Sequence, residues 1–305
     1  MGDDKSPGPD GFNAKFFKAT WDITGREVCA AVKEFFINGK LLRQLNHTII
    51  SLIPKVESPD RVEHYRPISC CNVVYKIISK VMTLRLGTCL GSLIDPAQSA
   101  FVEGRLMSDN IFLVQELLRK YSVKRDTRRC FLNVDLAKAY DTVSWEFLRF
   151  ALGHLGFPPK FVAWAMECVC SASYSIKINK GIYGFFPGKR GLRQGDPLSP
   201  LLFVICMELL SRLIKKETSR SSFQFHQHCE SLRLTHLIYA DDVVLFCRGD
   251  VSSVKVLIGC LERFKLMSGL SVNVGKSSIY FGSVPELERW PIIAATGFKV
   301  GEFPF

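Results

Sequence analysis

The sequence predicts a folded chain of mixed helices and strands, and three observations support this class. Of its 305 residues, 47% are hydrophobic and 23% are charged, a balance typical of globular proteins. Short apolar segments rich in β-branched residues, such as "HTIISLIPK" and "CFLNVDL", have the length and composition of strands. Longer segments with apolar residues at helical spacing lie between them. The expected fold class is therefore α+β.

The first third of the chain predicts a loop, a helix, two extended segments and a second helix. After the loop "DKSPGPDGF", Thr24 and Glu27 form a capping box for "EVCAAVKEFFING", and Asn38 with Gly39 ends that helix. "HTIISLIPK" is a predicted strand, and Pro67 forces the next segment to be extended. The following helix, "VVYKIISKVMTLRL", has one apolar face. Its members are Val74, Ile77, Ile78, Val81 and Leu84.

The remaining elements follow from the same patterns. We expect a helix from about Ser108, a strand over residues 130–136, and a helix capped by Ser144. A further buried helix begins near Ser199 in "PLSPLLFVICMELLSRLI". That segment is the most apolar of the chain, but Glu208 and Arg212 interrupt it, so no stretch predicts a membrane span. The N-terminus "MGDDKSPGPD" does not resemble a signal peptide.

The charge balance favours a polyanionic partner. Forty Lys and Arg against 29 Asp and Glu give a formal net charge of +11. Such a charge suits nucleic acid or an anionic membrane surface, and the missing span and signal favour nucleic acid. Eleven cysteines without a secretory signal or a C-x-x-C pair indicate a reducing compartment, in the nucleus or the cytoplasm. In "HQHC", His226, His228 and Cys229 lack a fourth metal ligand, so we expect a surface loop there.

Three aspartates stand out because they lie in or beside apolar strands. Asp241 and Asp242 interrupt "LIYADDVVLF", and neither has a Lys or Arg within five residues. Asp135 comes at the end of the strand "CFLNVDL". A single aspartate at a strand end most often caps the next turn. If the two strands are neighbours, however, the three carboxylates would form a site for hard divalent metal ions, which would supply the missing positive charge.

Seven segments in order resemble the reverse transcriptase domain of non-long-terminal-repeat (LINE-type) retrotransposons, most like plant elements. They are "LIPK", "RPIS" with "YKIISK", "QSAFVEGR", "NVDLAKAYD", "RGLRQGDPLSP", "YADD" and "SGLSVNVGKS". The resemblance implies a right-hand polymerase: a palm of antiparallel strands packed on helices, with N-terminal fingers. The implied divisions are an N-terminal extension with the start of the fingers (1–47), fingers (48–129), palm (130–283) and a short start of the palm–thumb connection (284–305). We expect the upstream endonuclease and most of the thumb to be absent.

The resemblance also implies the metal chemistry. Asp135 and Asp241 correspond to the metal-holding carboxylates, with Asp242 beside them and the carbonyl of Leu136 as a further contact. Two Mg²⁺ ions, which Mn²⁺ can replace, would support phosphoryl transfer to a primer 3′-hydroxyl. Lys276 in "NVGKS" resembles the lysine that protonates pyrophosphate, although a loop lysine is usually only solvated.

Further positions match residues that contact the incoming nucleotide. Lys55 and Arg66 resemble the basic residues that bind the triphosphate, whereas without the motifs they would be a surface lysine and a turn arginine. Tyr140 matches the aromatic ring that leaves no room for a ribose 2′-hydroxyl, although a tyrosine at a strand end is otherwise often core. Gln194 and Gly195 open a loop placed against the nucleotide and the template base.

Three functions of different class follow from these motifs. The first is an RNA-directed DNA polymerase that uses an RNA template, a DNA primer and deoxynucleoside triphosphates, and the intact aspartates favour it. The second is an inert nucleic-acid-binding fragment, and the third is an RNA-making palm polymerase or palm-fold cyclase, which Tyr140 disfavours. Arg190 and Arg193 could contact template phosphates or be solvated loop charges.

Overall fold

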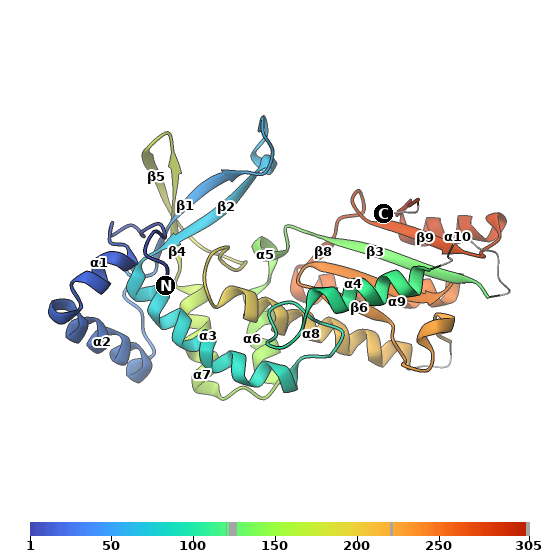
Figure 1. Ribbon diagram of the computed structural model, residues 1–305, viewed down its shortest axis with the longest axis horizontal. Coiled ribbons are helices and arrows are strands. Elements are labelled where there is room, and N and C mark those ends of the chain that lie inside the picture. The colour runs from blue at the N-terminus through green and yellow to red at the C-terminus, as the bar shows by residue number, and fades with distance from the viewer. Residues whose placement is uncertain (120, 122–126, 220–221, 303–305) are drawn as a thin grey trace. The chain divides into compact units, whose positions relative to one another are not determined.

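The chain forms two compact units, each built from two stretches of sequence. In the computed structural model, residues 1–119, 121, 127–219 and 222–302 are described. The first unit comprises residues 1–89 and 143–202, and the second comprises residues 90–142 and 203–305. Each unit has a β-sheet of its own, and each is considered separately below (Figure 1).

The sheet of the first unit has four strands in the order β2-β1-β4-β5. β1 pairs antiparallel with β2 and parallel with β4, and β4 forms an antiparallel hairpin with β5. The strands are β1 (His47–Pro54), β2 (Tyr65–Cys71), β4 (Ser173–Ile178) and β5 (Gly181–Pro187). The helices are α1 (Ala14–Ala19), α2 (Trp21–Asn38), α3 (Val73–Leu93), α6 (Trp145–His154) and α7 (Pro159–Cys170), with the start of α8 (Ser199–Thr218).

The sheet of the second unit has β3 at its centre. Its order is β10-β9-β3-β7-β6, with β8 also paired to β3, and every pair except β9 with β10 is antiparallel. The strands are β3 (Arg129–Ala137), β6 (His236–Tyr239), β7 (Asp242–Arg248), β8 (Ser271–Val272), β9 (Ser278–Gly282) and β10 (Lys299–Val300). The helices are α4 (Met107–Leu118), α5 (Ala139–Thr142), α9 (Val251–Ser268) and α10 (Glu286–Thr296), together with the end of α3 and most of α8.

Both faces of this central sheet are apolar along most of its length. Phe131 of β3 lies opposite Phe246 of β7 and Tyr280 of β9, and all three pack with Leu117 and Leu118 of α4 in one buried cluster. The alternate residues of β3 and β7, on the other face, are buried as well; they are Cys130, Leu132, Val134, Val243, Leu245 and Cys247. Burial on both faces explains why these strands are almost continuously apolar.

Most predicted elements are confirmed, and the differences have local causes. The predicted strands at 47–55 and 130–136 correspond to β1 and β3, and the side chain of Ser144 caps α6 as expected. The capping box is wrong: α2 begins at Trp21, and Thr24 lies inside it with its hydroxyl donating to the Thr20 carbonyl. Gly39 ends α2 in the left-handed conformation, at φ +72°.

The predicted apolar face of α3 is also mostly wrong. Leu84 is 61% exposed, whereas the fully buried positions include Tyr75 and Ser79. The buried face instead combines Ile78, Met82, Leu86 and Leu90 with these two polar side chains, which have a buried partner described below.

The mixed α+β class is confirmed, and the division into fingers and palm at the stated boundaries stays a prediction. Within the residues that the structure describes, no helix is both long and apolar enough to cross a membrane.

Candidate active site

Asp135 and Asp242 lie directly opposite each other on neighbouring strands. β3 and β7 are antiparallel, with Asp135 in register with Asp242. Opposite residues of an antiparallel pair point to the same face of the sheet. Asp241 precedes Asp242 in the two-residue connection from β6, where Tyr239 pairs with Asp242. The fold therefore gathers the three aspartates at one end of two adjacent strands.

The strand alternation explains how carboxylates occur within an apolar sequence. Along one face of the sheet, the β3–β7 pairs are Phe131 with Phe246, then Asn133 with Val244, then Asp135 with Asp242. The phenylalanines are buried under α4, whereas Asp242 is exposed and Asp135 is half-buried. The apolar residues serve the core, and the carboxylates come where that face reaches solvent.

The electrostatics of this acidic group are unfavourable without a counter-charge. Partial burial, and then the charges of Asp241 and Asp135, raise the pKa of the Asp242 carboxyl above its usual value. Among the ion pairs of the described residues, none joins Asp135, Asp241 or Asp242 to a lysine or arginine. A cation from outside the chain would relieve the repulsion.

The oxygen donors of this group are of the kind that bind hard divalent metal ions. In the described part of the chain, no three His, Cys, Asp or Glu side chains are close enough to form a ready metal cage. Mg²⁺, however, is usually held by one or two carboxylates together with substrate phosphates and water, and seldom by an all-protein cage. Opposed carboxylates such as Asp135 and Asp242 supply oxygen ligands of this kind.

The main chain of Asp135 is held by the segment that contains Lys276. The Ser277 hydroxyl accepts the Asp135 N–H at 3.1 Å, and the Asn273 N–H donates to the Asp135 carbonyl at 2.8 Å. Leu136 is paired with Val272 of β8 and is buried. Lys276 itself is exposed and lies in the turn between Asn273 and Ser277. The turn that carries Lys276 therefore lies beside the main chain of Asp135.

A buried glutamine supports the turn that carries Asp241. Ala240 has φ +57°, an uncommon conformation for a residue with a side chain. The Gln98 side-chain oxygen accepts the N–H of Ala240 at 3.3 Å and that of Ala100 at 3.0 Å. Gln98 has no exposed surface. The sequence pattern alone did not single out Gln98 or Ser277, although "QSAFVEGR" and "NVGKS" contain them.

Tyr140 is half-buried and lies in the short helix α5, directly after β3. Its ring stacks on Phe203 of α8, with centroids 4.9 Å apart and planes inclined by 16°. Burial, with a smaller contribution from the Asp241 carboxylate, raises the pKa of Tyr140 to about 12. The phenol is therefore neutral at ordinary pH, and the ring is fixed near Asp241.

Four predicted substrate residues lie in the first unit, on or beside the β1–β2 hairpin. Arg66 is exposed on β2 opposite Ile53, and Lys55 follows β1 with its ammonium donating to the Glu63 carbonyl at 2.9 Å. The Lys55 N–H donates to the His64 carbonyl at 2.8 Å, so Lys55 continues the hairpin that carries Arg66.

The other two predicted residues of this unit, Gln194 and Gly195, contact β2 at Ser69. The Ser69 N–H donates to the Gln194 carbonyl at 2.8 Å. Gly195 has φ +104°, and a Cβ added there would lie 3.2 Å from the Ser69 carbonyl oxygen. The position therefore requires glycine, both for its backbone conformation and for its close approach to β2.

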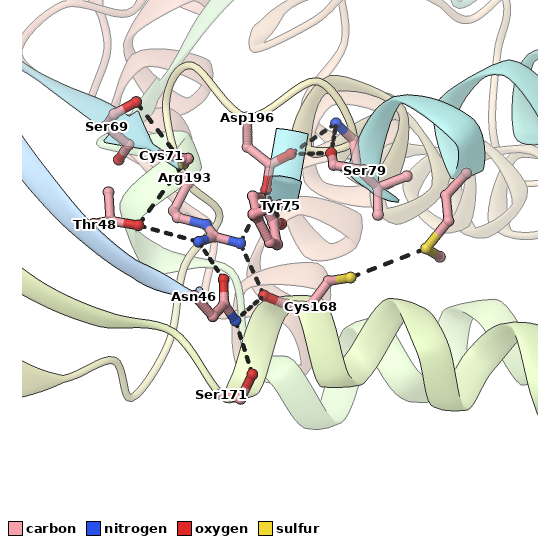
Figure 2. Close-up of polar contacts among 12 residues, drawn as sticks. Asn46, Thr48, Ser69, Cys71, Tyr75, Ser79, Cys168, Ser171, Arg193 and Asp196 are labelled. Carbon is pink, nitrogen blue, oxygen red and sulfur yellow. Dashed lines mark hydrogen bonds and ion pairs between the residues drawn. The ribbon is translucent and has the colours of Figure 1, made fainter. Parts of the chain in front are cut away.

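Two expectations about polar side chains are wrong. Arg193 is neither solvated nor available to template phosphates, because it is buried in an ion pair with Asp196 (Figure 2). His226 and Cys229 do not form a surface loop: both are fully buried beside a 3₁₀ turn, and the His226 ring accepts the His228 N–H. Sequence patterns assign polar residues to the surface and therefore do not predict buried polar pairs.

Comparison with known proteins identifies the family of the chain. A reverse transcriptase (RNA-dependent DNA polymerase) domain matches residues 53–299. The chain is 32% identical over 278 residues to the transposon TX1 uncharacterized 149 kDa protein of Xenopus laevis, covering 91% of this chain and 21% of that protein. It is 27% identical over 302 residues to the Pol polyprotein of the type-2 retrotransposable element R2DM of Drosophila melanogaster, covering 97% of this chain and 27% of that protein. The chain thus spans less than a third of either relative.

Solved structures agree at the level of the fold. Telomerase from Candida tropicalis, in a complex with a fragment of telomeric RNA, aligns with a TM-score of 0.55 at 14% identity, over 86% of this chain and 45% of that one. The likeness confirms the predicted polymerase palm fold. Since the domain match covers most of the sequence and the relatives are retrotransposon proteins, the chain belongs to the reverse transcriptase family, in its non-long-terminal-repeat branch.

Proposed function

We propose that the chain is the RNA-directed DNA polymerase core of a LINE-type retroelement. The observation that carries the proposal is the opposed pair Asp135 and Asp242, beside Asp241, at the end of the central strands. Among the described residues, no lysine or arginine forms an ion pair with these three carboxylates, so they do not serve a structural salt bridge. They suit an enzyme in which substrate phosphates arrive with their own counter-ions.

Reverse transcriptases as a family use divalent metal ions. In this chain Asp135, Asp241 and Asp242 would hold two Mg²⁺ ions, which when bound would supply positive charge to the phosphates during transfer. The contribution of the protein is to fix the carboxylates beforehand. The Ser277 hydroxyl and the Asn273 N–H each form a hydrogen bond with the main chain of Asp135. These bonds fix the end of the strand, so little reorganisation of the site is needed during the reaction.

The remaining residues bind and select the substrates. Arg66 on β2 and Lys55 directly after β1 would contact the triphosphate, where the Arg fork can bind phosphate oxygens in pairs. Tyr140 would exclude the ribose 2′-hydroxyl, and Lys276 would give a proton to the leaving pyrophosphate. The substrates would be an RNA template, a DNA primer and deoxynucleoside triphosphates. The enzyme would act inside the cell, in the nucleus or the cytoplasm.

Primer extension tests the proposal. The chain is incubated with poly-A RNA, an oligo-dT primer, Mg²⁺ and either deoxy- or ribonucleoside triphosphates. We expect incorporation of dTTP that depends on Mg²⁺ and is lost in Asp135→Asn and Asp241→Asn, since each variant loses a proposed metal ligand. Glu262→Gln, which removes an exposed carboxylate on α9, is the matched control and should retain activity.

Two other results would overturn the proposal. Binding of the template–primer without incorporation would indicate the nucleic-acid-binding alternative, which the net charge of +11 makes a real competitor. Preferred incorporation of ribonucleotides would indicate an RNA-making polymerase. Thermal unfolding of each variant, measured in parallel, separates loss of a ligand from loss of the fold.

A further inference from the structure

The loop over residues 191–199 of the first unit is buried apart from its centre. Gly195 is exposed and Gln194 is half-buried, whereas Arg193 and Asp196 on either side of them are each 5% exposed. Loops usually lie on the surface, because buried main-chain and charged groups need partners. The charged pair that brackets Gln194 and Gly195 therefore needs an explanation.

Arg193 ties the loop to two separate elements. Its guanidinium donates to the Asn46 side chain at 2.6 Å and the Thr48 hydroxyl at 3.2 Å, both at the start of β1. It also donates to the Cys168 carbonyl near the end of α7 at 2.9 Å, as Figure 2 shows. The guanidinium carbon lies 4.0 Å from the centre of the Tyr75 ring. A guanidinium can make all these contacts at once because its donors point in several directions.

Asp196 ties the loop to α3. It accepts hydrogen bonds from the hydroxyls of Tyr75 and Ser79, and it forms an ion pair with Arg193 at 3.2 Å (Figure 2). Burial raises the pKa of the Tyr75 phenol well above its usual range, so this hydroxyl keeps the proton that it donates. The Leu198 N–H donates back to Asp196 at 3.0 Å and to Ser79 at 3.1 Å, which closes the loop on itself.

The contacts leave the two central residues little freedom. Each neighbour is held by its side chain, and the Gln194 carbonyl itself accepts the Ser69 N–H of β2 at 2.8 Å. Four elements, β1, β2, α3 and α7, thus contribute to the position of one dipeptide. Burying two charges is costly compared with apolar side chains, and such pairs are often no more stable than an apolar replacement. Stability alone is therefore a poor reason for this arrangement.

We infer that Arg193 and Asp196, with Tyr75 and Ser79, are positioning residues that fix Gln194 and Gly195 for the incoming deoxynucleoside triphosphate. This inference rests on the proposed polymerase function, and it adds residues that do not themselves touch the substrate. The competing explanation is that the network only stabilises the first unit.

Conservative variants separate the two explanations. Tyr75→Phe and Ser79→Ala each remove one donor to Asp196 and leave the ion pair in place. Leu86→Ala, seven residues after Ser79 on α3 and 1% exposed, is the control that destabilises the same helix about two turns away from the network. For each variant we would measure the unfolding midpoint, amide hydrogen exchange of residues 190–199, and the steady-state constants for dTTP and for template–primer.

We expect the two network variants to raise the KM for dTTP about tenfold, the effect of losing one hydrogen bond to a charged group. Their template–primer KM should stay within about twofold, and exchange of the loop amides should rise about tenfold. Leu86→Ala should lower the unfolding midpoint with the KM for dTTP unchanged. Equal KM values for dTTP in the parent, Tyr75→Phe and Ser79→Ala would overturn the inference.

A double variant that removes both buried charges tests the inference even if the single variants unfold. Asp196→Asn leaves the Arg193 charge buried alone, so its unfolding midpoint should fall sharply. Arg193→Met combined with Asp196→Asn should recover much of that midpoint while the KM for dTTP stays raised. Recovery of both quantities would assign the network to stability alone. An inactive parent would overturn the proposed function together with this inference, whereas an active parent with unaffected variants would overturn only the inference.

Discussion

Replacing Asp242 by asparagine should make the metal-free chain more stable while abolishing polymerase activity. Asp242 lies directly opposite Asp135 in the β3–β7 pair and is next to Asp241. Its raised pKa reports the cost of holding these charges together. Asparagine has nearly the same shape and cannot ionise, so the substitution removes the repulsion and changes little else. A residue whose loss stabilises the fold is one that the fold does not require.

The size of the effect follows from the cross-strand geometry. Like charges directly opposite each other on an antiparallel pair destabilise it by roughly 0.2–1 kcal/mol. Asp242 is exposed, so water and salt screen the interaction, and we take about 0.5 kcal/mol as the expected gain in the free energy of unfolding. For a domain of this size such a gain corresponds to a rise of about 1–2 °C in the unfolding midpoint.

A double-mutant cycle isolates the Asp135–Asp242 repulsion. Unfolding is measured by urea in EDTA for the parent, Asp135→Asn, Asp242→Asn and the double variant, at low salt and at 0.5 M NaCl, a concentration chosen to give a Debye length of about 4–5 Å. The gain from Asp242→Asn should shrink in the Asp135→Asn background and at high salt. A loss of stability in Asp242→Asn would refute the reasoning, because the carboxylate would then have a structural partner. A gain in stability that is the same in the Asp135→Asn background and at high salt would also refute it, because the gain would not come from charge repulsion.

Two further predictions concern selectivity and pH. Tyr140→Ala should reduce discrimination against ribonucleotides by roughly 10- to 200-fold, whereas Tyr140→Phe should discriminate like the parent. Discrimination is measured as the ratio of kcat/KM for dTTP to kcat/KM for UTP. An Ala variant that is active and discriminates like the parent would remove Tyr140 from the site. His226 and His236 are buried, and burial lowers the pKa of each to about 4. In the unfolded chain they take up protons near pH 6.5, so stability is full above that pH and should fall between pH 6.5 and 4, by at most about 3 kcal/mol for each histidine. Urea unfolding across this range checks it, and a flat profile would contradict it.

The acidic group could be predicted from sequence because its signal is local. Asp241 and Asp242 interrupt an apolar run without a nearby basic residue, and Asp135 ends a second run of the same kind. Two strands that are apolar on both faces must lie inside a sheet, where they have few possible neighbours. Which residues face each other was still open, because the register depends on pairing between distant segments. The structure supplies that register.

The buried polar network could not be predicted, because its members lie far apart in sequence and follow no period. Tyr75 and Ser79 are 121 and 117 residues from Asp196. Taken alone, a tyrosine and a serine on a helix that also carries Val74 and Leu84 belong to the polar face. In the structure both side chains are buried, because each donates a hydrogen bond to the Asp196 carboxylate, and a buried carboxylate needs such donors. Tyr75 and Ser79 therefore share the buried face of α3 with apolar residues such as Ile78, Met82 and Leu86.

The two predicted substrate sites are built in the same way despite lying in different units. In each, a neighbouring serine holds the main chain of the residue proposed to act: the Ser277 hydroxyl accepts the N–H of Asp135, and the Ser69 N–H donates to the carbonyl of Gln194. Such bonds fix where a side chain starts without consuming its own hydrogen-bonding capacity. A carboxylate held by its own oxygens would have fewer left for a metal ion. A hydrogen bond to the main chain therefore fixes the position of Asp135 and leaves its carboxylate oxygens available to a metal ion.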